Sequence, residues 1–234
     1  MSCLEMLINK SYKDLLNEVK MYIHFKPFTK EELQQAVDEW CTDRDKAINK
    51  YWHISLWDTS LITDMSNLFK GKENFNDFIG YWDVSNVIIM ENMFCSTNLF
   101  NQPLDYWDVS SVTNMKKIFC FAKSFNQSLS SWDVSRVINM HGMFAGAMSF
   151  NKELNSWDVS RVTNMCRMFW SAKSFNQPLD LWETSSVIIM NGMFFCALSF
   201  NNSLESWNIS SVTDMTEMFG KTYSLSVKPR WYNE

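Results

Sequence analysis

The sequence is poor in glycine, with only 6 glycines in 234 residues. Calcium-binding β-rolls need dense glycine and aspartate in nine-residue units, so this composition argues against such a roll. Histidine is also scarce, and His24, His53 and His141 lie far apart in the sequence. No GxSxG, HExxH, Walker-loop or CxxC motif is present. We therefore predict a protein that is not an enzyme and that holds no metal ion and no cofactor.

Long apolar runs and a basic surplus are missing as well. No run is long enough to span a membrane, and charged residues interrupt Met1 to His24, where a secretory signal needs an unbroken apolar core. The net charge of -5 gives no general attraction to nucleic acid or anionic lipid. These features predict a cytoplasmic or virion-associated protein without a membrane span or a nucleic-acid partner.

The 6 cysteines are spread thinly along the chain. In a chain without an export signal, this spacing favours free thiols. Cys95 and Cys120 occupy the same position of a repeat and are therefore expected to be neighbours in space. A disulfide between these two cysteines is the alternative to two free thiols.

Aromatic residues and methionine are abundant, with 18 Phe, 16 Met and 11 Trp. Most of them recur at fixed positions of a 25-residue repeat. The tryptophans that mark the repeat are Trp57, Trp82, Trp107, Trp132, Trp157, Trp182 and Trp207. Units of this length cannot each enclose a core, so the repeat predicts one continuous solenoid rather than separate domains.

Each repeat carries two patterns that predict secondary structure. From Ser110 to Ala122 the apolar residues stand three and four apart, which predicts a short helix capped by Ser110. The stretch from Leu104 to Trp107 is interpreted as a short strand, since Pro103 and Pro178 precede its equivalents at a first-strand position. The expected fold class is therefore α/β, with one short strand and one short helix in each coil.

Residues 1–50 lack the repeat and are expected to form a helical N-terminal cap. A first helix is predicted from Leu4 to Tyr22, and Thr29 with Glu32 resembles a capping box that starts a second helix reaching Ala47. A solenoid exposes an apolar end that such a cap covers; the alternative is a separate recruitment domain. We assign residues 51–225 to the seven-copy solenoid and residues 226–234 to a C-terminal lid.

The repeated motifs carry a family resemblance. Trp-Asp-Val-Ser, followed by Val-Thr-Asn-Met, a Met-Phe pair and Phe-Asn, resembles the repeat of BspA-like leucine-rich-repeat surface proteins, from about Tyr51 to Phe219. The resemblance implies a right-handed, leucine-rich-repeat-like solenoid with a binding rather than a catalytic role. It also implies a place among bacterial surface proteins, protist proteins and proteins of large DNA viruses, so a cell-surface location follows from the resemblance alone.

Two polar rows of the repeat are assigned structural roles. The aspartate after each tryptophan, with the serine two residues later, is expected to hold a turn and cap the helix, in preference to binding cations. The asparagine after each phenylalanine is expected to form a ladder between coils. The central members of this ladder are Asn101, Asn126, Asn151 and Asn176.

Positions that vary between repeats are not needed for the core, so they are the candidates for binding. A basic strip for an acidic partner is one hypothesis, and an ordinary solvated surface is the alternative. The residues of the strip are Lys116, Lys117, Arg136, Arg161 and Arg167. Phe121, Trp170 and Phe195 are expected either to form a docking patch or to seal a corner of the coil.

The functional hypothesis is a non-catalytic scaffold that binds another protein. The alternative is a structural component of a surface layer or a virus particle, in which self-association matters more than a soluble partner. A third hypothesis is that the protein is an enzyme, for which no sequence motif argues. The identity of the partner and the oligomeric state do not follow from the sequence.

Overall fold

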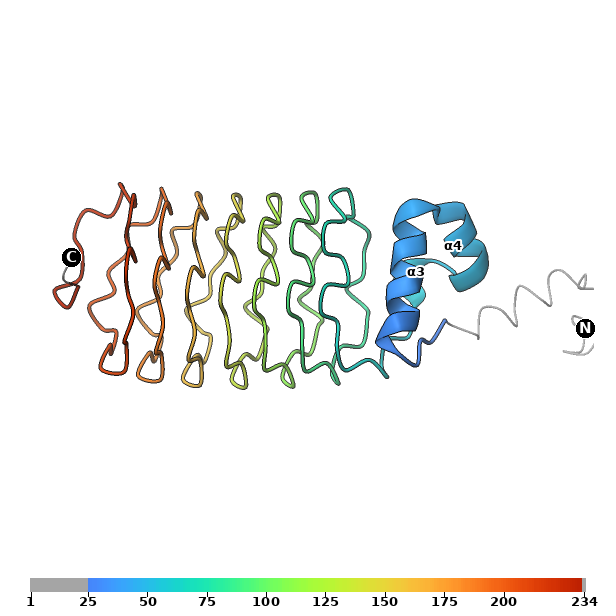
Figure 1. Cartoon of the computed structure of the whole chain (residues 1–234), viewed down its shortest axis with the longest axis horizontal. Helices are drawn as coiled ribbons and strands as arrows, with labels where there is room; N and C mark the ends of the chain where they lie inside the picture. Colours follow the sequence, from blue (N-terminus) through green and yellow to red (C-terminus); the bar gives the residue numbers. More distant parts are fainter. Residues whose placement is uncertain (1–24, 233–234) are drawn as a thin grey trace, which may run out of the picture.

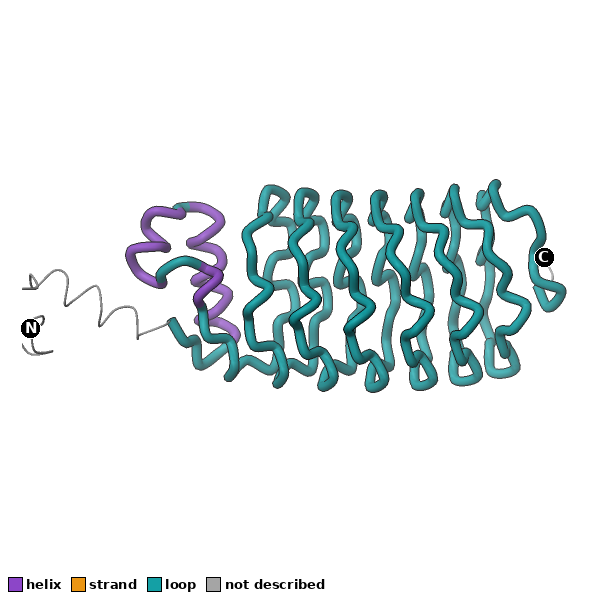
Figure 2. Tube along the Cα trace, turned by 180° about the vertical axis from the view of Figure 1, so that it is seen from behind, coloured by secondary structure: helices purple, strands orange, loops and turns teal. Residues whose placement is uncertain are grey.

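The computed structural model describes residues 25–232, so the helix predicted from Leu4 to Tyr22 lies outside the described residues. Helices α3 (Lys30–Thr42) and α4 (Arg44–Tyr51) and the 3-10 helix η1 (Ile54–Leu56) come first in the described chain. Figure 1 shows them at one end of an elongated stack of coils, with the last coil at the other end. Nearly all of the remaining chain is loop and turn (Figure 2).

Successive coils are held together by main-chain hydrogen bonds, most of them between residues 24 or 25 positions apart. A single parallel bridge per coil runs the whole length of the array, and no longer strand forms between residues 25 and 232. The bridged positions are Asp64, Ile89, Asn114, Asn139, Asn164, Ile189 and Asp214. The repeats therefore form one stack in which each coil contacts the coil before it and the coil after it.

The prediction of a helix in each coil is wrong. The amides of Lys117 and Phe119 donate to carbonyls of the next coil at 2.8 and 3.0 Å, whereas the amide of Ile118 between them bonds back to the Met115 carbonyl at 3.2 Å. An α-helix needs every amide to bond within its own segment. Lys117 also has a φ of 55°, outside the right-handed helical region. The segment is a run of β-turns in which every second amide donates a hydrogen bond to the next coil.

The prediction of a strand from Leu104 to Trp107 is wrong as well. The Trp107 amide donates to the Leu104 carbonyl at 3.1 Å, so the chain turns between these two residues. The turn directs both side chains into the core although they are three positions apart, and both are buried. The fold is consequently a repeat structure low in regular secondary structure, not an α/β array.

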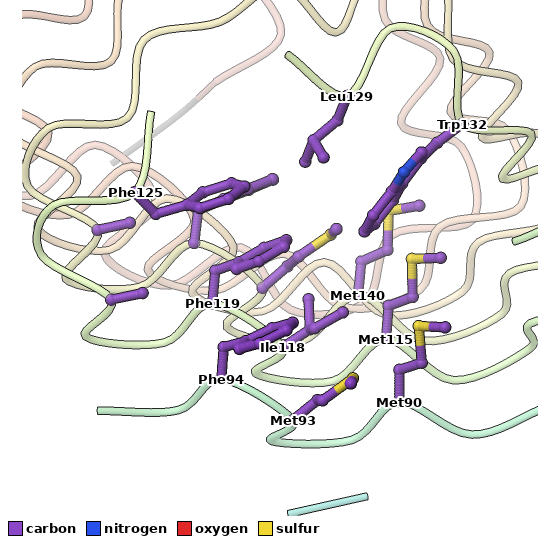
Figure 3. Close-up of a cluster of buried hydrophobic side chains, with 14 of the residues drawn as sticks. Met90, Met93, Phe94, Met115, Ile118, Phe119, Phe125, Leu129, Trp132 and Met140 are labelled. Atoms are coloured by element: carbon purple, nitrogen blue, oxygen red, sulfur yellow. The ribbon is translucent and has the colours of Figure 1, made fainter. Parts of the chain in front are cut away.

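The core consists of rows of identical side chains that run along the stack. Figure 3 shows Met90, Met115 and Met140 in one row and Phe94 with Phe119 in another. The Phe94 and Phe119 rings are 5.6 Å apart with an interplanar angle of 3°. Each coil thus packs a side chain against the identical side chain of its neighbour, which gives close packing.

The repeated tryptophans are buried and also cross-link the coils. Trp132 is 3% exposed, and its ring stacks on Trp107 at 6.4 Å. Its indole nitrogen donates to the Leu104 carbonyl of the preceding coil at 3.0 Å. The same contact recurs from Trp82 to Trp207, each time with the residue 28 positions earlier. A buried indole N–H needs such a partner.

The aspartate row forms turns, as expected, but it caps no helix. The Ser135 amide donates to the Asp133 carboxylate at 3.0 Å, which closes an Asx turn. The side chain and the backbone amide of Ser135 lower the pKa of Asp133. Glu183 and Asn208 hold the same turn at their positions. The capping part of the interpretation fails because no helix follows the turn.

The asparagine row forms a ladder between coils. The side-chain oxygen of Asn101 accepts the backbone amide of Asn126 at 2.9 Å, and Asn126 accepts that of Asn151 at 3.0 Å. Gln127 adds a bond to the Asn101 carbonyl at 2.9 Å. The ladder supplies acceptors to main-chain amides on the side of the coil that has no bridge.

The N-terminal helices cover the first coil. Thr29 accepts the Glu32 amide at 3.2 Å, and the Glu32 carboxylate accepts the Phe28 amide at 2.7 Å instead of the Thr29 amide. Helix α3 ends before Asp43, and Asp43 caps α4, so Ala47 lies on a separate helix. Leu33, Ala36, Val37 and Trp40 of α3 are buried. A salt bridge of 2.9 Å joins Lys30 of α3 to Asp64 of the first coil.

Removing one central indole should destabilise the whole stack. Trp132→Ala deletes a buried aromatic and its hydrogen bond to Leu104, so the free energy of unfolding should fall by about 3–5 kcal/mol. Urea denaturation followed by circular dichroism measures this change. Leu181→Ala, at a side chain that is 72% exposed, is the control and should leave the midpoint almost unchanged. Equal midpoints for both variants would contradict the role of the tryptophan row.

Glycine should stabilise the chain at a turn position that now holds serine. Ser171 has a φ of 54°, and Gly146 occupies the equivalent position one coil earlier with a φ of 67°. Relief of the left-handed strain outweighs the entropy of the added glycine by about 0.5–1 kcal/mol. Ser171→Gly should therefore raise the thermal midpoint, whereas Ser174→Gly, at an exposed position without positive φ, should lower it. If both substitutions shifted the thermal midpoint in the same direction, the result would contradict this account.

Candidate protein-binding surface

Three of the five predicted basic residues lie close together. Lys116, Lys117 and Arg167 surround His141, and their positive charges, together with burial of the ring, lower the pKa of this histidine. Burial is the largest cause, and the charge of Glu91 opposes it only weakly. His141 is therefore neutral near pH 7, and the positive charge of the surface comes from the lysines and the arginine.

One of these charges is neutralised by a residue that the sequence did not single out. The Lys116 ammonium lies 2.9 Å from the Glu91 carboxylate of the preceding coil. This ion pair lowers the pKa of Glu91, and Asn114 donates to the same carboxylate at 3.2 Å. Lys117 and Arg167 form no ion pair within residues 25–232. In this cluster, Lys117 and Arg167 are therefore the two cations that can pair with a ligand.

The two remaining candidates lie on a different part of the coil. Arg136 contributes to a shallow groove of ≈ 560 Å³. The other residues that line this groove are Ser60, Leu61, Thr63, Asn86, Ile88, Ser111 and Thr113. Arg161 is exposed and occupies the position of Arg136 one coil further along. The five candidates therefore divide between two surfaces and do not make one strip.

The three variable aromatic residues come together on the surface. The Phe121 and Trp170 rings are 6.1 Å apart although two coils separate them, and Trp170 stacks on Phe195 at 6.5 Å. The intervening coil has Gly146, where any side chain would collide with the Phe121 ring. Lys221 extends the row with its ammonium 5.6 Å from the Phe195 ring. We call Phe121, Trp170 and Phe195 the aromatic row.

A groove joins the aromatic row to the unpaired arginine. It has a volume of ≈ 260 Å³. Its lining residues are Arg167, Trp170, Asn191, Gly192, Phe195, Thr216 and Glu217. The side-chain oxygen of Asn191 is buried and has no hydrogen-bond donor among the described residues. A ligand group that donates a hydrogen bond would satisfy this oxygen.

The sequence indicated the aromatic residues but not the features that shape the groove. Gly146 and Gly192 stand at repeat positions where most other coils carry larger side chains, and both have positive φ. The Phe121 ring lies over Gly146, and the Arg167 side chain lies beside Gly192. The signal in the sequence was that glycine, which is scarce in this chain, occurs at these two repeat positions.

Cys95 and Cys120 are neighbours, as their shared repeat position suggested, and both are free thiols in the structure. The Cys120 thiol donates to the Cys95 sulfur, which lowers the pKa of Cys95 and raises that of Cys120. Ser96 and Lys70 add to the effect on Cys95. Cys41, Cys166 and Cys196 are also free thiols, and Cys3 lies outside the described residues.

Residues 25–232 lack two further kinds of feature. No three side chains of histidine, cysteine, aspartate or glutamate gather there in a way that could hold a metal ion. None of the helices in this range has the length and apolar character needed to cross a lipid bilayer.

The fold and the surface together define a protein of stacked 25-residue coils with a variable side face. The chain belongs to the family described as Mycoplasma protein of unknown function, DUF285, which it matches over residues 42–156 and again over residues 127–231. The two matches overlap within the array, as expected for a repeated unit. No curated protein and no solved structure matches the chain.

The hydrogen bond between Cys120 and Cys95 should be visible in thiol chemistry. At pH 7 iodoacetamide should modify Cys95 faster than Cys166, whose pKa is raised by burial, because only the thiolate reacts. Cys120→Ala removes the donor and should move the pH profile of Cys95 alkylation to higher pH. Alanine is tolerated at this repeat position, as Ala145 demonstrates.

Mass spectrometry of peptides after timed alkylation measures both rates. Cys196, on the same side of the array, is the internal control because the Cys120 substitution does not touch it. An unchanged profile for Cys95 in the variant would contradict the assigned hydrogen bond.

Proposed function

We propose that the protein is a non-catalytic scaffold that binds another protein along the side of its stack. The observation that carries the proposal is the aromatic row beside the unpaired Arg167, with Trp170, Phe195 and Asn191 lining the same groove as this arginine. Phe121 is 39% exposed, and Trp170 and Phe195 are half-buried, whereas the repeated phenylalanines of the core are buried. Contiguous exposed aromatic surface marks interaction sites.

The chemistry of the surface favours a partner segment with an apolar and an acidic part. Tryptophan and arginine are enriched among the few residues that dominate the binding energy of protein interfaces. Arg167 and Lys117 offer charge to a carboxylate, and the aromatic row offers a platform for an apolar side chain. The net charge of the whole chain is -5, so a local positive surface discriminates among partners.

The resemblance to BspA-like repeat proteins supports the same class of function. It rests on the Trp-Asp-Val-Ser repeat and not on leucine-rich-repeat helices, which residues 51–225 do not form. Right-handed winding of the stack and a place among surface or virus proteins remain predictions. A structural role in a larger assembly is the alternative that the test below separates.

The test compares capture of partners by the parent protein and by two variants. Arg167→Glu with Trp170→Ala should weaken binding of a stoichiometric partner by about 30-fold or more, since a central contact residue contributes at least about 2 kcal/mol. Arg136→Glu with Arg161→Glu alters charge on the other surface and should leave binding unchanged. Titration calorimetry with the purified partner measures both affinities.

Three outcomes would contradict the proposal. Unchanged affinity in the Arg167 and Trp170 variant would show that the aromatic row is not the binding site. Loss of affinity only in the Arg136 and Arg161 variant would move the site to the other groove. Recovery of the chain with itself alone, together with concentration-dependent sedimentation, would favour an assembly component.

A further inference from the structure

Cys95 and Cys120 are in contact across the boundary between the second and third coils. They occupy the same repeat position, 25 residues apart. Main-chain hydrogen bonds hold this register on both sides of Cys95. The Phe94 amide donates to the Ile118 carbonyl at 2.8 Å. The Ser96 amide donates to the Cys120 carbonyl at 2.7 Å, so the two cysteines stay opposite each other while the coils are stacked.

The spacing of paired coils suits a disulfide. Neighbouring main chains in a parallel ladder lie about 4.8 Å apart, and a disulfide joins Cα atoms that are about 4.4–6.8 Å apart. Side chains at one repeat position point the same way, and the Cys120 thiol already donates a hydrogen bond to the Cys95 sulfur. A bond between the two sulfurs can therefore form without a change in the register of the coils.

Cys95 has the surroundings of a reactive thiol. It is half-buried rather than enclosed in the core. The Ser96 hydroxyl lies 3.9 Å from its sulfur, and Lys70, at the same repeat position one coil earlier, contributes positive charge. The hydrogen bond from Cys120 and these two groups favour the thiolate and lower the pKa of Cys95. A partly exposed thiolate beside positive charge is the form of cysteine that reacts with oxidants.

Cys120 has the surroundings of a second thiol that reacts after the first. Its side chain is only 5% exposed. The hydrogen bond to Cys95 and burial raise the pKa of Cys120. Cys120 therefore keeps its proton while Cys95 is ionised, and it lies within reach of the Cys95 sulfur. Thiols that respond to oxidants commonly have such a second cysteine beside them.

We propose that Cys95 and Cys120 are a reversible redox pair, which a hydroperoxide converts to a disulfide. In the first step the Cys95 thiolate attacks one oxygen of the peroxide and the O–O bond breaks. Cys95 becomes a sulfenic acid, and the leaving oxygen takes up the proton that the Cys95 thiol had lost and departs as water or an alcohol.

The second step closes the disulfide. The Cys120 sulfur attacks the Cys95 sulfur, the S–O bond breaks, and the hydroxyl group leaves as water with the proton of the Cys120 thiol. The two sulfurs together lose two electrons, which the peroxide has accepted. Exchange with an external thiol reverses the reaction and restores both cysteines.

Packing does not require cysteine at this repeat position. Ala145, Trp170 and Phe195 occupy it in later coils. The disulfide closes a loop of the chain and ties the second coil to the third, which constrains the unfolded chain. The redox pair does not depend on partner binding by the aromatic row, because the test below uses the protein alone.

The test treats the reduced full-length chain with equimolar hydrogen peroxide at pH 7 and blocks free thiols with N-ethylmaleimide at timed intervals. Trypsin cleaves after Lys116 and Lys117, which places Cys95 and Cys120 on separate peptides. Mass spectrometry without reduction should find these peptides joined, at a mass two hydrogens below their sum, and dithiothreitol should separate them. Cys196 is the internal control and should stay reduced, because serine stands at its repeat position in the preceding coil.

Two substitutions assign the roles of the thiols. Cys120→Ala should abolish the disulfide and leave a sulfenic acid on Cys95, which dimedone traps. Cys95→Ala should leave Cys120 as a free thiol under the same conditions. Ala145 demonstrates that alanine fits this repeat position.

A third substitution tests the charge beside Cys95. Lys70→Met removes the ammonium and should slow the oxidation of Cys95 about 2- to 5-fold, the range expected for one exposed charge. Lys123→Met is the matched control at another exposed lysine and should leave the rate unchanged. Equal rates in these two variants would contradict the role given to Lys70.

Three results would overturn the redox pair. The first is oxidation of Cys95 no faster than that of Cys196. The second is sulfinic acid on Cys95 while Cys120 remains reduced, since Cys120 would then fail to close the disulfide. The third is a dimedone adduct on Cys120 in the Cys95→Ala variant at the rate at which Cys95 reacts in the Cys120→Ala variant, since the two thiols would then not differ.

Discussion

The structure depends on the pairing of alternate main-chain amides between coils 25 residues apart. Within one coil the turns satisfy only every second amide of the segment after the bridge, as in the bond from Ile118 to Met115. The others, such as Met115 and Lys117, find acceptors only on the next coil. Because a buried amide without an acceptor costs about 1–3 kcal/mol, no coil is stable alone. Stability is a property of the neighbouring pair.

This pairing fixes the register, and the register explains the repeated side chains. When coils stack at one residue spacing, each position faces its own copy, so the tryptophan, phenylalanine and asparagine positions become continuous rows. Rows of identical apolar side chains pack closely, whereas a change at one position must fit the coils on both sides. Some positions nevertheless differ between coils, such as Gly146 beneath the Phe121 ring. At these positions the shape of the surface changes from one coil to the next.

The same constraint places the variable side chains on the sides of the stack. The aromatic row and Arg167 lie there. At one end of the stack, helix α3 covers the first coil and donates a hydrogen bond from Gln34 to the Leu68 carbonyl. The side face is therefore where the side chains differ from coil to coil.

Much of the architecture followed from the sequence, and the errors have one source. Rows of tryptophan, methionine and phenylalanine were expected in the core because they recur at a fixed spacing. The helix prediction failed because steps of three and four residues fit consecutive β-turns as well as a helix. Periodicity reports which side chains turn inward, and it does not report where the amides bond. The positive φ at Lys117 and Phe121 shows the difference, yet neither residue type predicts it.

The candidate site was anticipated in part, for the same reason. The aromatic row was recognisable as a set of variable positions, whereas the partition of the basic residues was not. Arg136 and Arg167 lie at different positions of the coil, on either side of the bridge. Glu91 neutralises Lys116 from the preceding coil. Ion pairs of this kind depend on distances between coils, which sequence spacing alone does not give.

The sequence by itself determined the repeat, its register and the composition of the core, because these depend on residue identity and spacing. The tertiary structure decided which amides bond between coils and which charges remain unpaired. These features depend on distances between main-chain atoms of different coils, and such distances exist only once the coils are stacked.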